Sequence, residues 1–386
     1  MKAPKIRFKG FEGDWQKFKI KDICINKWTW TLTKDKVASE YWYPVINWWV
    51  SNYWYYFDYN NENAITISSR WENAGYAKYN KWKFRAWWLC YVYESQKHNT
   101  QFIGILLNGK EKHIKSTMIA RTTIPALNKS EFNEYFITIP EKQKEQEKIW
   151  AFFEKLDTQI TQQSQKLEKL KNIKQSFLQK LFPKDWSALP ELRFKGFEGD
   201  FIIKTLWDFS SVFWWNAWKS DSYDKNWEYL VVTIANVTWE KYINTEIWNK
   251  INIKLPNNYI LNKNDILISL TWNVGRVSKC SNVKAVLNQR VWKLIIEGID
   301  INNDFIFHFL RNKKFEKAMI DAWQWAAQKN ISNNDITSSV ISLPSLPEQE
   351  KIWAFFEKLD TQITHQSQKI QKLQNIKQSL LEKMFI

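Results

Sequence analysis

The sequence predicts an α+β protein made of two tandem domains, each followed by a long helix, with the two helices pairing as an antiparallel coiled coil. Two repeats carry this prediction. Residues 145–161, EQEKIWAFFEKLDTQIT, return unchanged at 348–364, and residues 7–14, RFKGFEGD, return unchanged at 193–200. Repetition of this kind is typical of a duplicated structural unit. We call the RFKGFEGD segment the box. The chain therefore contains two copies of one series, in which a box is followed by a variable domain and then by a long helix.

The predicted helices cover 145–182 and 348–385, where apolar residues recur at alternating steps of four and three or their multiples. This spacing indicates a heptad seam, and its polar interruptions, Lys174 and Lys377 among them, would help to fix the register. Two such helices in one chain indicate an intramolecular coiled coil. The predicted seam consists of Ile149, Phe153, Leu156, Ile160, Leu167 and Leu170, matched by Ile352, Phe356, Leu359, Ile363, Ile370 and Leu373.

Prolines mark the expected boundaries. Pro140 and Pro347 lie just before the helical repeats, where proline suits a first helical turn or the end of a strand. Pro183 ends the first helix, because proline cannot continue one. We therefore expect a first domain at 1–140, a helix at 141–183, a linker at 184–192, a second domain at 193–345 and a helix at 346–386.

Inside the domains, short apolar runs ended by turn residues predict strands at 64–68, 135–139, 231–237 and 266–270. A further run, GILLNGK at 104–110, matches the spacing of a phosphate-binding loop. It has Glu111 where a serine or threonine would hold magnesium, and an acid there would repel phosphate. We expect a hairpin turn at Asn108-Gly109 instead.

The formal charge of +16 favours an anionic partner, either nucleic acid or a membrane surface. Cys24, Cys90 and Cys280 are isolated, so neither a zinc site nor a disulfide framework is indicated, and we expect buried thiols in a reducing cytosol. The scattered histidines indicate no metal site. A signal peptide and a membrane span are not expected, so the predicted location is cytoplasmic.

Basic residues in the variable domains cluster in predicted strand-end loops, whereas the helix lysines alternate with glutamates and are interpreted as a solvated face. Arginine can pair with two acceptors on guanine, and lysine neutralises phosphate. The candidate DNA contacts are Arg70, Lys78, Lys81, Lys83 and Arg85 in the first domain, and Lys219, Arg276, Lys279 and Arg290 in the second.

The chain has 25 tryptophans but only 9 glycines. Several tryptophans stand where turn chemistry favours glycine, as at Trp48-Trp49, Trp87-Trp88, Trp214-Trp215 and Trp272. Paired indoles in loops would expose a large apolar area. Our hypothesis is that many of these residues are glycines in the cell, encoded by UGA codons that were read as tryptophan.

The order of these motifs resembles the specificity (S) subunits of type I restriction-modification systems. The resemblance rests on the box before each domain and on three segments: TWNVGR at 271–276, AAQKNIS at 326–332 and LPSLPEQEKIWAFFEKLDTQI at 343–363. It covers essentially the whole chain. This sequence departs from the family by having tryptophan where the family tends to have glycine or another small residue, at Trp71, Trp150, Trp207, Trp272 and Trp353.

The resemblance implies a subunit without catalytic activity that reads double-stranded DNA. Each variable domain would be a target recognition domain for one half of a bipartite site, and the helices would act as ruler and docking surface. The implied partners are two methyltransferase (M) subunits and, through them, restriction (R) subunits. S-adenosylmethionine, ATP and magnesium would belong to those partners, with no cofactor on this chain.

Two other functions stay open at this point. A self-contained DNA methyltransferase or nuclease would need catalytic motifs, and the sequence has no Asp/Asn-Pro-Pro-aromatic box for amino methylation. A coiled-coil scaffold without DNA affinity would bind its partners independently of salt, whereas recognition through phosphates weakens steeply as salt rises.

Overall fold

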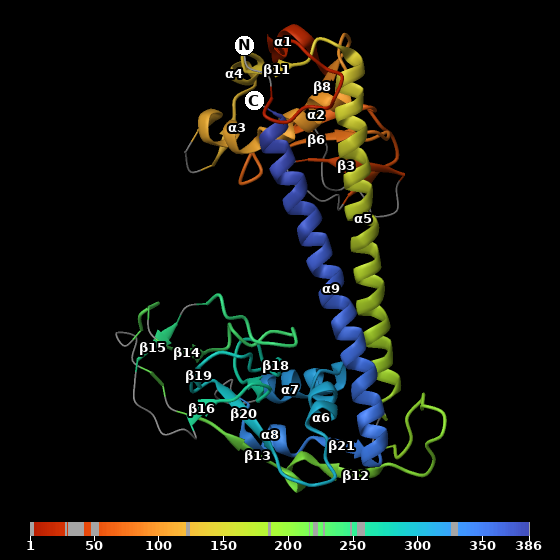
Figure 1. The fold of residues 1–386 in the computed structure, drawn as a ribbon, viewed down its shortest axis with the longest axis vertical. Helices are drawn as coiled ribbons and strands as arrows, with labels where there is room; N and C mark the ends of the chain where they lie inside the picture. Colours follow the sequence, from red (N-terminus) through yellow and green to blue (C-terminus); the bar gives the residue numbers. More distant parts are fainter. Residues whose placement is uncertain are drawn as a thin grey trace. The chain divides into compact units, whose positions relative to one another are not determined.

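The structure is a computed structural model that describes residues 4–27, 29, 42–47, 54–120, 124–183, 187–215, 217–218, 223–226, 228–247, 249–252, 259–325 and 331–385. The chain divides into two compact units (Figure 1). The first unit combines Met1–Ser164 with Gln368–Ile386, and the second consists of Gln165–Ser367. Each unit therefore contains one variable domain and parts of both long helices.

The first unit contains small sheets that match the predicted α+β class. Its four-stranded antiparallel sheet has the order β2-β8-β5-β6, and a three-stranded sheet β4-β3-β7 contains the parallel pair β3 and β7. Two further pairs, β1 with β11 and β9 with β10, are antiparallel. The strands are β1 (Gln16–Lys19), β2 (Cys24–Lys27), β3 (Tyr43–Ile46), β4 (Tyr55–Tyr56), β5 (Ala64–Ser68), β6 (Ala77–Asn80), β7 (Arg85–Ala86), β8 (Cys90–Ser95), β9 (Ile119–Ala120), β10 (Ala126–Leu127) and β11 (Phe136–Ile139), and the helices are α1 (Ile20–Ile23), α2 (Thr100–Gly109), α3 (Glu111–Met118) and α4 (Lys129–Asn133).

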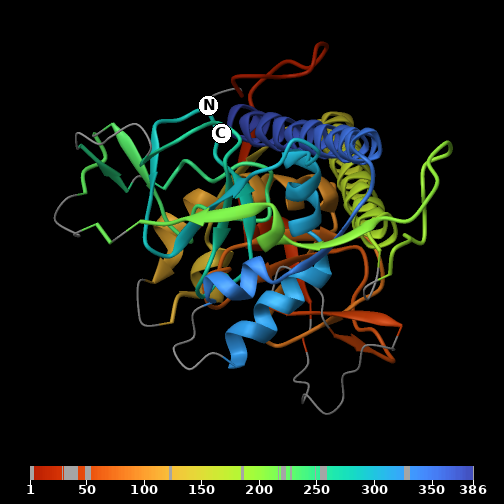
Figure 2. The ribbon, with the colours of Figure 1, turned by 90° about the horizontal axis from the view of Figure 1, so that it is seen from below.

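The second unit repeats this topology. Its antiparallel sheet β13-β20-β17-β18 corresponds to β2-β8-β5-β6, and the parallel pair β14 and β19 in the sheet β15-β14-β19-β16 corresponds to β3 and β7. Figure 2 shows its light-blue helices beside green and teal strands. The elements are β12 (Ile202–Thr205), η2 (Leu206–Asp208), β13 (Ser210–Phe213), β14 (Tyr229–Val232), β15 (Lys250–Ile251), β16 (Ile260–Leu261), β17 (Ile266–Ser269), β18 (Val277–Lys279), β19 (Ala285–Leu287), β20 (Val291–Ile296), α6 (Asn303–Leu310), α7 (Lys313–Trp325), α8 (Asn333–Thr337) and β21 (Val340–Leu343).

The predicted strands at 64–68, 135–139 and 266–270 are confirmed as β5, β11 and β17. The prediction for 231–237 is only partly right, because β14 ends at Val232. The side chain of Asn236 then accepts a hydrogen bond from the main-chain N–H of Thr233 at 2.8 Å and closes a turn. Asparagine side chains favour such local bonds over a strand ladder.

The predicted hairpin turn at Asn108-Gly109 is wrong, because both residues lie in helix α2. The helix begins at Asn99, whose side chain accepts a hydrogen bond from the N–H of Phe102 at 2.8 Å, the usual role of an N-cap. A Cβ atom at Gly104 would lie 2.9 Å from Cβ of Tyr79, so glycine lets the helix lie close against β6. Tertiary packing thus outweighs the local turn signal.

The long helices are α5 (Gln143–Lys180) and α9 (Leu346–Met384), close to the predicted bounds. In the first unit, α5 meets the end of α9 in two places: Asp157 bonds to Lys377 at 2.6 Å, and the rings of Phe153 and Phe385 lie 6.0 Å apart. The residue number falls along α5 as it rises along α9, so the helices run antiparallel there.

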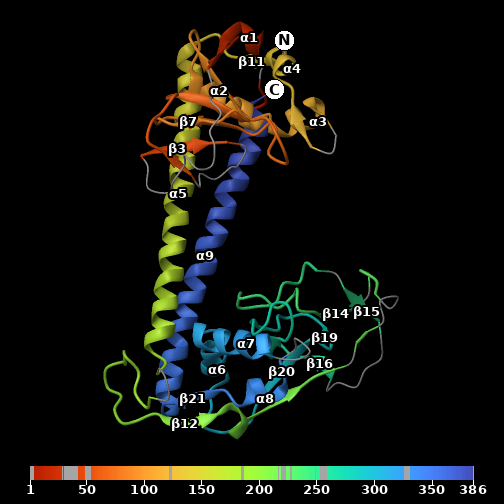
Figure 3. The ribbon, with the colours of Figure 1, turned by 180° about the vertical axis from the view of Figure 1, so that it is seen from behind.

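The second unit has the same arrangement between the other halves of the helices. Lys174 pairs with Asp360, and the rings of Phe182 and Phe356 lie 6.2 Å apart. Helix α6 lies beside the start of α9 (Figure 3), and its buried residues share one core with both helices. Each unit therefore anchors the beginning of one long helix and the end of the other in a single core.

All predicted seam residues are buried or half-buried. Ile149 and Phe153 also belong to the core of the first domain, together with Trp15 and Phe102, and Ile352 and Phe356 belong to the core of the second. The beginning of each helix is thus part of its domain. Among the described residues, no helix is both long and apolar enough to cross a membrane.

Candidate nucleic-acid interface

The repeated box ties each domain to its helix. The guanidinium of Arg7 donates to both carboxylate oxygens of Glu145 at 2.7 and 2.8 Å, and to the main-chain oxygens of Glu12 and Gly13 at 3.1 and 2.6 Å. Arg193 makes the corresponding contacts with Glu348 at 2.9 and 2.7 Å, and with the oxygens of Glu198 and Gly199. Only the planar guanidinium can make a fork of this kind.

A glutamine next to each glutamate connects the helix to the domain core. The side-chain oxygen of Gln146 accepts from the N–H of Asn99, and its amide donates to the oxygen of Pro140. Gln349 bonds in the same way to Asn302 and Pro344. The identical Glu-Gln pair of the repeat is therefore explained by structure, because it fixes the direction in which each helix leaves its domain.

The first domain holds its candidate basic residues at the ends of β5, β6 and β7. Arg70, Lys78, Lys81 and Lys83 are exposed, whereas Arg85 is half-buried and lies 3.5 Å from Asp58. The structure thus leaves four of the five side chains accessible to an anionic ligand.

Aromatic rings accompany these cations. The ammonium of Lys83 lies 4.4 Å from the ring centre of Tyr59, and the hydrogen bond to this tyrosine raises the pKa of Lys83. The guanidinium of Arg85 lies 4.9 Å from the ring of Tyr56. Trp82, between the lysines, is 76% exposed. Cations interleaved with aromatic rings can bind phosphates and stack on bases. The tyrosines were not predicted, although the alternation in KWKFR at 81–85 is the signal that could have drawn attention to this loop.

In the second domain, two candidate arginines meet at the end of β17. The main-chain oxygen of Arg276 accepts from the N–H of Ser269 at 3.0 Å, and that of Arg290 accepts from the N–H of Leu270 at 3.1 Å. Arg290 is exposed and Arg276 is half-buried. The corresponding strand end of the first domain, after β5, carries Arg70. Both domains therefore have arginine at the same edge of their corresponding four-stranded sheets.

One of the predicted DNA contacts, Lys279, is corrected by the structure, because its side chain is not accessible. Its side chain is 4% exposed, pairs with Asp304 and lies 4.7 Å from the ring centre of Phe307. Burial, together with the nearby charge of Lys241, lowers the pKa of Lys279 to about 8. It cannot reach DNA from this position and serves the packing of α6 on β18. Lys219 lies outside the described residues.

The turns next to these arginines have an unusual backbone. Trp71 and Trp272 have φ angles of 64° and 56°, in the left-handed region that bulky side chains rarely adopt. Trp272 is 80% exposed. Both residues are among the tryptophans that we suspect to be glycines.

The described cysteines and metal-binding residue types do not form a reactive site. No group of three or more His, Cys, Asp or Glu side chains is placed among the described residues to hold a metal. Burial raises the pKa of all three cysteines to about 12, so the thiols are unreactive rather than nucleophilic. Burial also lowers the pKa of His308 well below its ordinary value.

Comparison with known proteins shows the family of the chain and supports its fold. The type I restriction modification DNA specificity domain matches the chain twice, over residues 12–172 and 203–375. The chain belongs to this family. As a specificity subunit it recognises DNA sequence and has no catalytic activity of its own.

Individual relatives agree with this assignment. The type I restriction enzyme MjaVIII specificity subunit of Methanocaldococcus jannaschii is 24% identical over 298 residues, which cover 71% of this chain and 67% of the relative. The crystal structure of a type I restriction-modification S subunit from M. genitalium has a TM-score of 0.70 at 17% identity and covers 100% of this chain and 99% of that one. A structure on the assembly and conformational transition of the type I R-M system has a TM-score of 0.55 at 14% identity, covering 97% and 98%.

Proposed function

We propose that this specificity subunit reads a bipartite, asymmetric DNA site with one recognition domain for each half, and that it recruits two methyltransferase subunits and, through them, restriction subunits. S-adenosylmethionine, ATP and magnesium are bound by these partners. The observation that carries the proposal is a surface that occurs twice in the chain with identical residues, next to two domains of equal topology and different loops.

The two recognition domains support a site with two different halves. The strands of their four-stranded antiparallel sheets have the same order and direction, so both sheets present the end of an inner strand, β5 or β17, in the same way. The residues at that edge differ: Arg70 follows β5, whereas the main chains of Arg276 and Arg290 flank the end of β17. A common framework with different base-reading side chains recognises two different short sequences.

The repeated surface supports two copies of one partner. Exposed residues of duplicated segments are free to diverge, because packing does not constrain them. Here the exposed positions stay identical, for example Glu147, Lys148 and Lys155 with Glu350, Lys351 and Lys358. A requirement outside the fold of the monomer explains this best. Two identical surfaces need two identical partners.

Part of this surface is apolar, as expected for a protein interface. Phe8 of the box lies edge-on to Phe152 of α5, with ring centres 5.7 Å apart, and Phe152 is 37% exposed. The ammonium of Lys148 lies 5.3 Å from the ring of Phe8. In the second unit, Phe194 and Phe355 form the corresponding pair at 5.7 Å. We call each of these a junction patch.

The test is the stoichiometry of the complex with a methyltransferase subunit from the same type I system. Phe152→Glu should reduce the bound methyltransferase from two copies to one, Phe355→Glu should do the same, and the double variant should bind none. Ile299→Glu replaces an apolar residue that is 93% exposed elsewhere and serves as the control. Native mass spectrometry distinguishes these species. A double variant that still binds two copies would rule out the junction patches.

The bipartite site has a separate test based on helix length. Seven residues inserted after Leu167 in α5 and seven after Gln366 in α9 would keep the pairs Asp157–Lys377 and Lys174–Asp360 in register. The helices would lengthen by about 10 Å, which corresponds to about three base pairs of duplex. Methylome sequencing of cells that express the complex should give the same two half-sequences with a longer spacer. An unaltered spacer would refute the ruler.

A further inference from the structure

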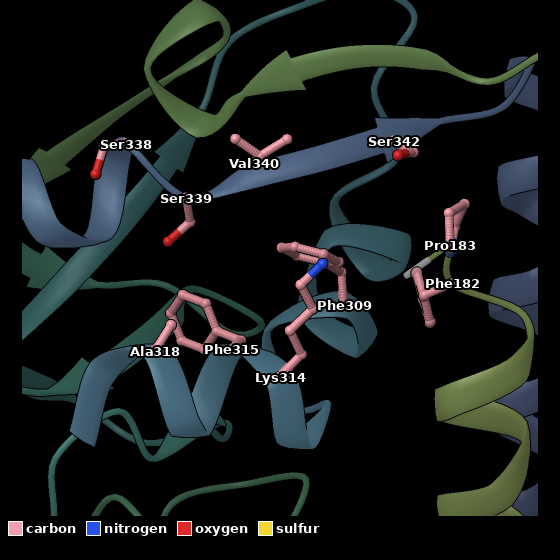
Figure 4. A pocket seen from close by; sticks show the side chains of 10 residues that line it. All are labelled: Phe182, Pro183, Phe309, Lys314, Phe315, Ala318, Ser338, Ser339, Val340 and Ser342. Carbon is pink, nitrogen blue, oxygen red and sulfur yellow. The ribbon is translucent and has the colours of Figure 1, made fainter. Parts of the chain in front are cut away.

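The second unit has a surface pocket of about 200 Å³ (Figure 4). Its apolar lining includes Phe182, which follows α5, Phe309 of α6 and Phe315 of α7. Ser339 and Ala318 lie at one end of it, Ser339 above Ala318 in the view of Figure 4, and Lys314 lines it as well. Such a combination of aromatic walls and a few polar groups is typical of a ligand site.

Comparison with the first unit shows which side chain is missing at one side of this pocket. There the main-chain N–H of Ile20 donates to the oxygen of Tyr135 at 3.0 Å, and in the second unit the N–H of Leu206 donates to the oxygen of Ser339 at 3.0 Å. The donors are separated by 186 residues, like the two boxes. The register of β11 on β1 also equals that of β21 on β12. Ser339 therefore occupies the position of Tyr135.

The opposite side of the pocket is matched by a second pair of contacts. A Cβ atom at Gly75 would lie 3.1 Å from Ile114 of α3, and one at Gly275 would lie 2.7 Å from Met319 of α7. Both glycines donate their N–H to the equivalent serine at the end of the central strand. Met319 thus corresponds to Ile114. The residue before it, Ala318, corresponds to His113.

In the first unit, a tyrosine side chain joins these two positions. The Tyr135 hydroxyl lies 2.9 Å from Nδ1 of His113, and its ring is stacked on that of Phe132 with centres 6.0 Å apart. In the second unit, serine and alanine replace the tyrosine and the histidine. The pocket therefore includes the position that the Tyr135 side chain occupies in the first unit, and the second unit has no tyrosine there.

We propose that this pocket binds a single phenol ring, presented as the tyrosyl side chain of a partner polypeptide. An apolar cavity of about 150 Å³ is large enough for benzene, so about 200 Å³ accommodates a phenol. The phenylalanine rings supply the contacts that aromatic rings prefer. Lys314 and Ser338 lie at the exposed mouth, where a phenolic hydroxyl can bond to a polar group or to water. The proposal does not depend on the function proposed above.

The probe is p-cresol, which is the tyrosine side chain as far as Cβ. In calorimetric titration of the full chain, we expect one saturable site. Ser339→Tyr supplies the ring from the chain itself and should abolish binding. Asn334→Tyr adds the same side chain at an exposed position of the neighbouring helix α8 and should leave binding unchanged. Absence of a saturable site in the wild type, or equal binding by Ser339→Tyr, would overturn the proposal.

Two more measurements complete the test. N-acetyl-tyrosine amide should compete with p-cresol, because only the ring enters the pocket; if p-cresol binds and the amide does not, the site takes free phenols and the assignment to a partner side chain is wrong. In the first unit, the double variant Tyr135→Ser, His113→Ala should create a second p-cresol site. A stoichiometry that stays at one in a variant with native near-ultraviolet circular dichroism would refute the equivalence of the two positions.

Discussion

The carboxylate of Asp157 lies 2.6 Å from the ammonium of Lys377 in the first unit, and the equivalent residues pair in the second unit with the helices exchanged, as Asp360 with Lys174. Their surroundings differ. Asp157 and Lys377 are 47% and 25% exposed, whereas Asp360 and Lys174 are 9% and 7% exposed. Asp360 also accepts from Arg311 at 3.1 Å. Duplication thus preserved the pair, while the second unit enclosed it in a buried cluster of charges.

Removal of the Asp360 carboxylate should therefore cost much more stability than removal of the Asp157 carboxylate. Asp360→Asn removes the charge of the carboxylate to which the buried Lys174 and Arg311 both bond, and we expect a loss of about 3–5 kcal/mol in the free energy of unfolding. Asp157→Asn breaks an exposed pair and should cost about 0–1 kcal/mol. Urea unfolding of both variants measures the difference. Equal losses would contradict the environments described here.

The buried lysine should also make stability depend on alkaline pH. Burial, with the nearby charge of Arg311, lowers the pKa of Lys174 to about 8, against about 10.4 in an unfolded chain. Between these values the unfolded chain holds a proton that the folded chain has released, so the free energy of unfolding rises with pH. Below about pH 8 both the folded and the unfolded chain hold this proton, so the gain in the free energy of unfolding is lost.

The measurement compares the wild type with Lys174→Met by urea unfolding at pH 7.5 and pH 9.5. Groups away from this cluster titrate equally in both proteins, so the difference between them reports on Lys174 and its charged neighbours. The wild type should gain stability relative to the variant as the pH rises, by at most about 1.4 kcal/mol per pH unit. A relative loss over this range would mean that the pair with Asp360 outweighs burial.

The arginines at the ends of the central strands should act on opposite halves of the DNA site. Arg70→Ala is expected to relax or weaken recognition of one half, and Arg276→Ala that of the other, by about 1–3 kcal/mol if a base contact is lost. Binding of both should still weaken as salt rises. Methylome sequencing and salt-dependent binding assays test this. Unchanged affinity and an unchanged motif would remove that arginine from the interface.

Lys279→Ala separates a DNA contact from a structural role. Because Lys279 pairs with Asp304 inside the second unit, the variant should lose stability in urea unfolding. The affinity that remains in folded protein should equal that of the wild type. A pure loss of DNA affinity with normal stability would instead restore Lys279 to the interface.

The repeats made the duplicated α+β architecture and the long helices predictable, because two identical segments reveal an equivalence without any knowledge of local propensity. Helix α5 runs from Gln143 to Lys180 and ends just before Pro183, as predicted. Single residues were harder. Asn108-Gly109 has the local chemistry of a turn, but the segment is helical, with buried side chains and with Gly104 packed closely on β6.

The candidate interface shows the same limit. Lys279 and Lys78 both belong to strands and have the same chemistry in the sequence, yet one side chain points to Asp304 and the other to solvent. Burial of a side chain depends on which distant residues pack against it in the folded protein. The spacing of charges along the sequence does not contain that information. The aromatic partners Tyr56 and Tyr59 were missed for the same reason, since they come from a segment that precedes the basic loop by more than twenty residues.

Trp272 offers a test of the hypothesis that many of the tryptophans are glycines in the cell. A bulky residue with a φ of 56° stores strain of about 1–3 kcal/mol, and a side chain that is 80% exposed gains little from burial. Trp272→Gly relieves the strain and costs only about 0.4–1 kcal/mol through the greater freedom of the unfolded chain. The variant should therefore be more stable in urea unfolding.

Trp15 is the matched control, because it is 1% exposed in the core of the first unit and glycine there would leave a cavity. We expect Trp15→Gly to lose at least about 3–5 kcal/mol. Peptide mass spectrometry of the protein from its own cells answers the question of decoding directly, with glycine expected at 71 and 272. Indoles at both positions, or a destabilised Trp272→Gly, would mean that the strained turns are native and that the left-handed backbone is held by the neighbouring strand ends.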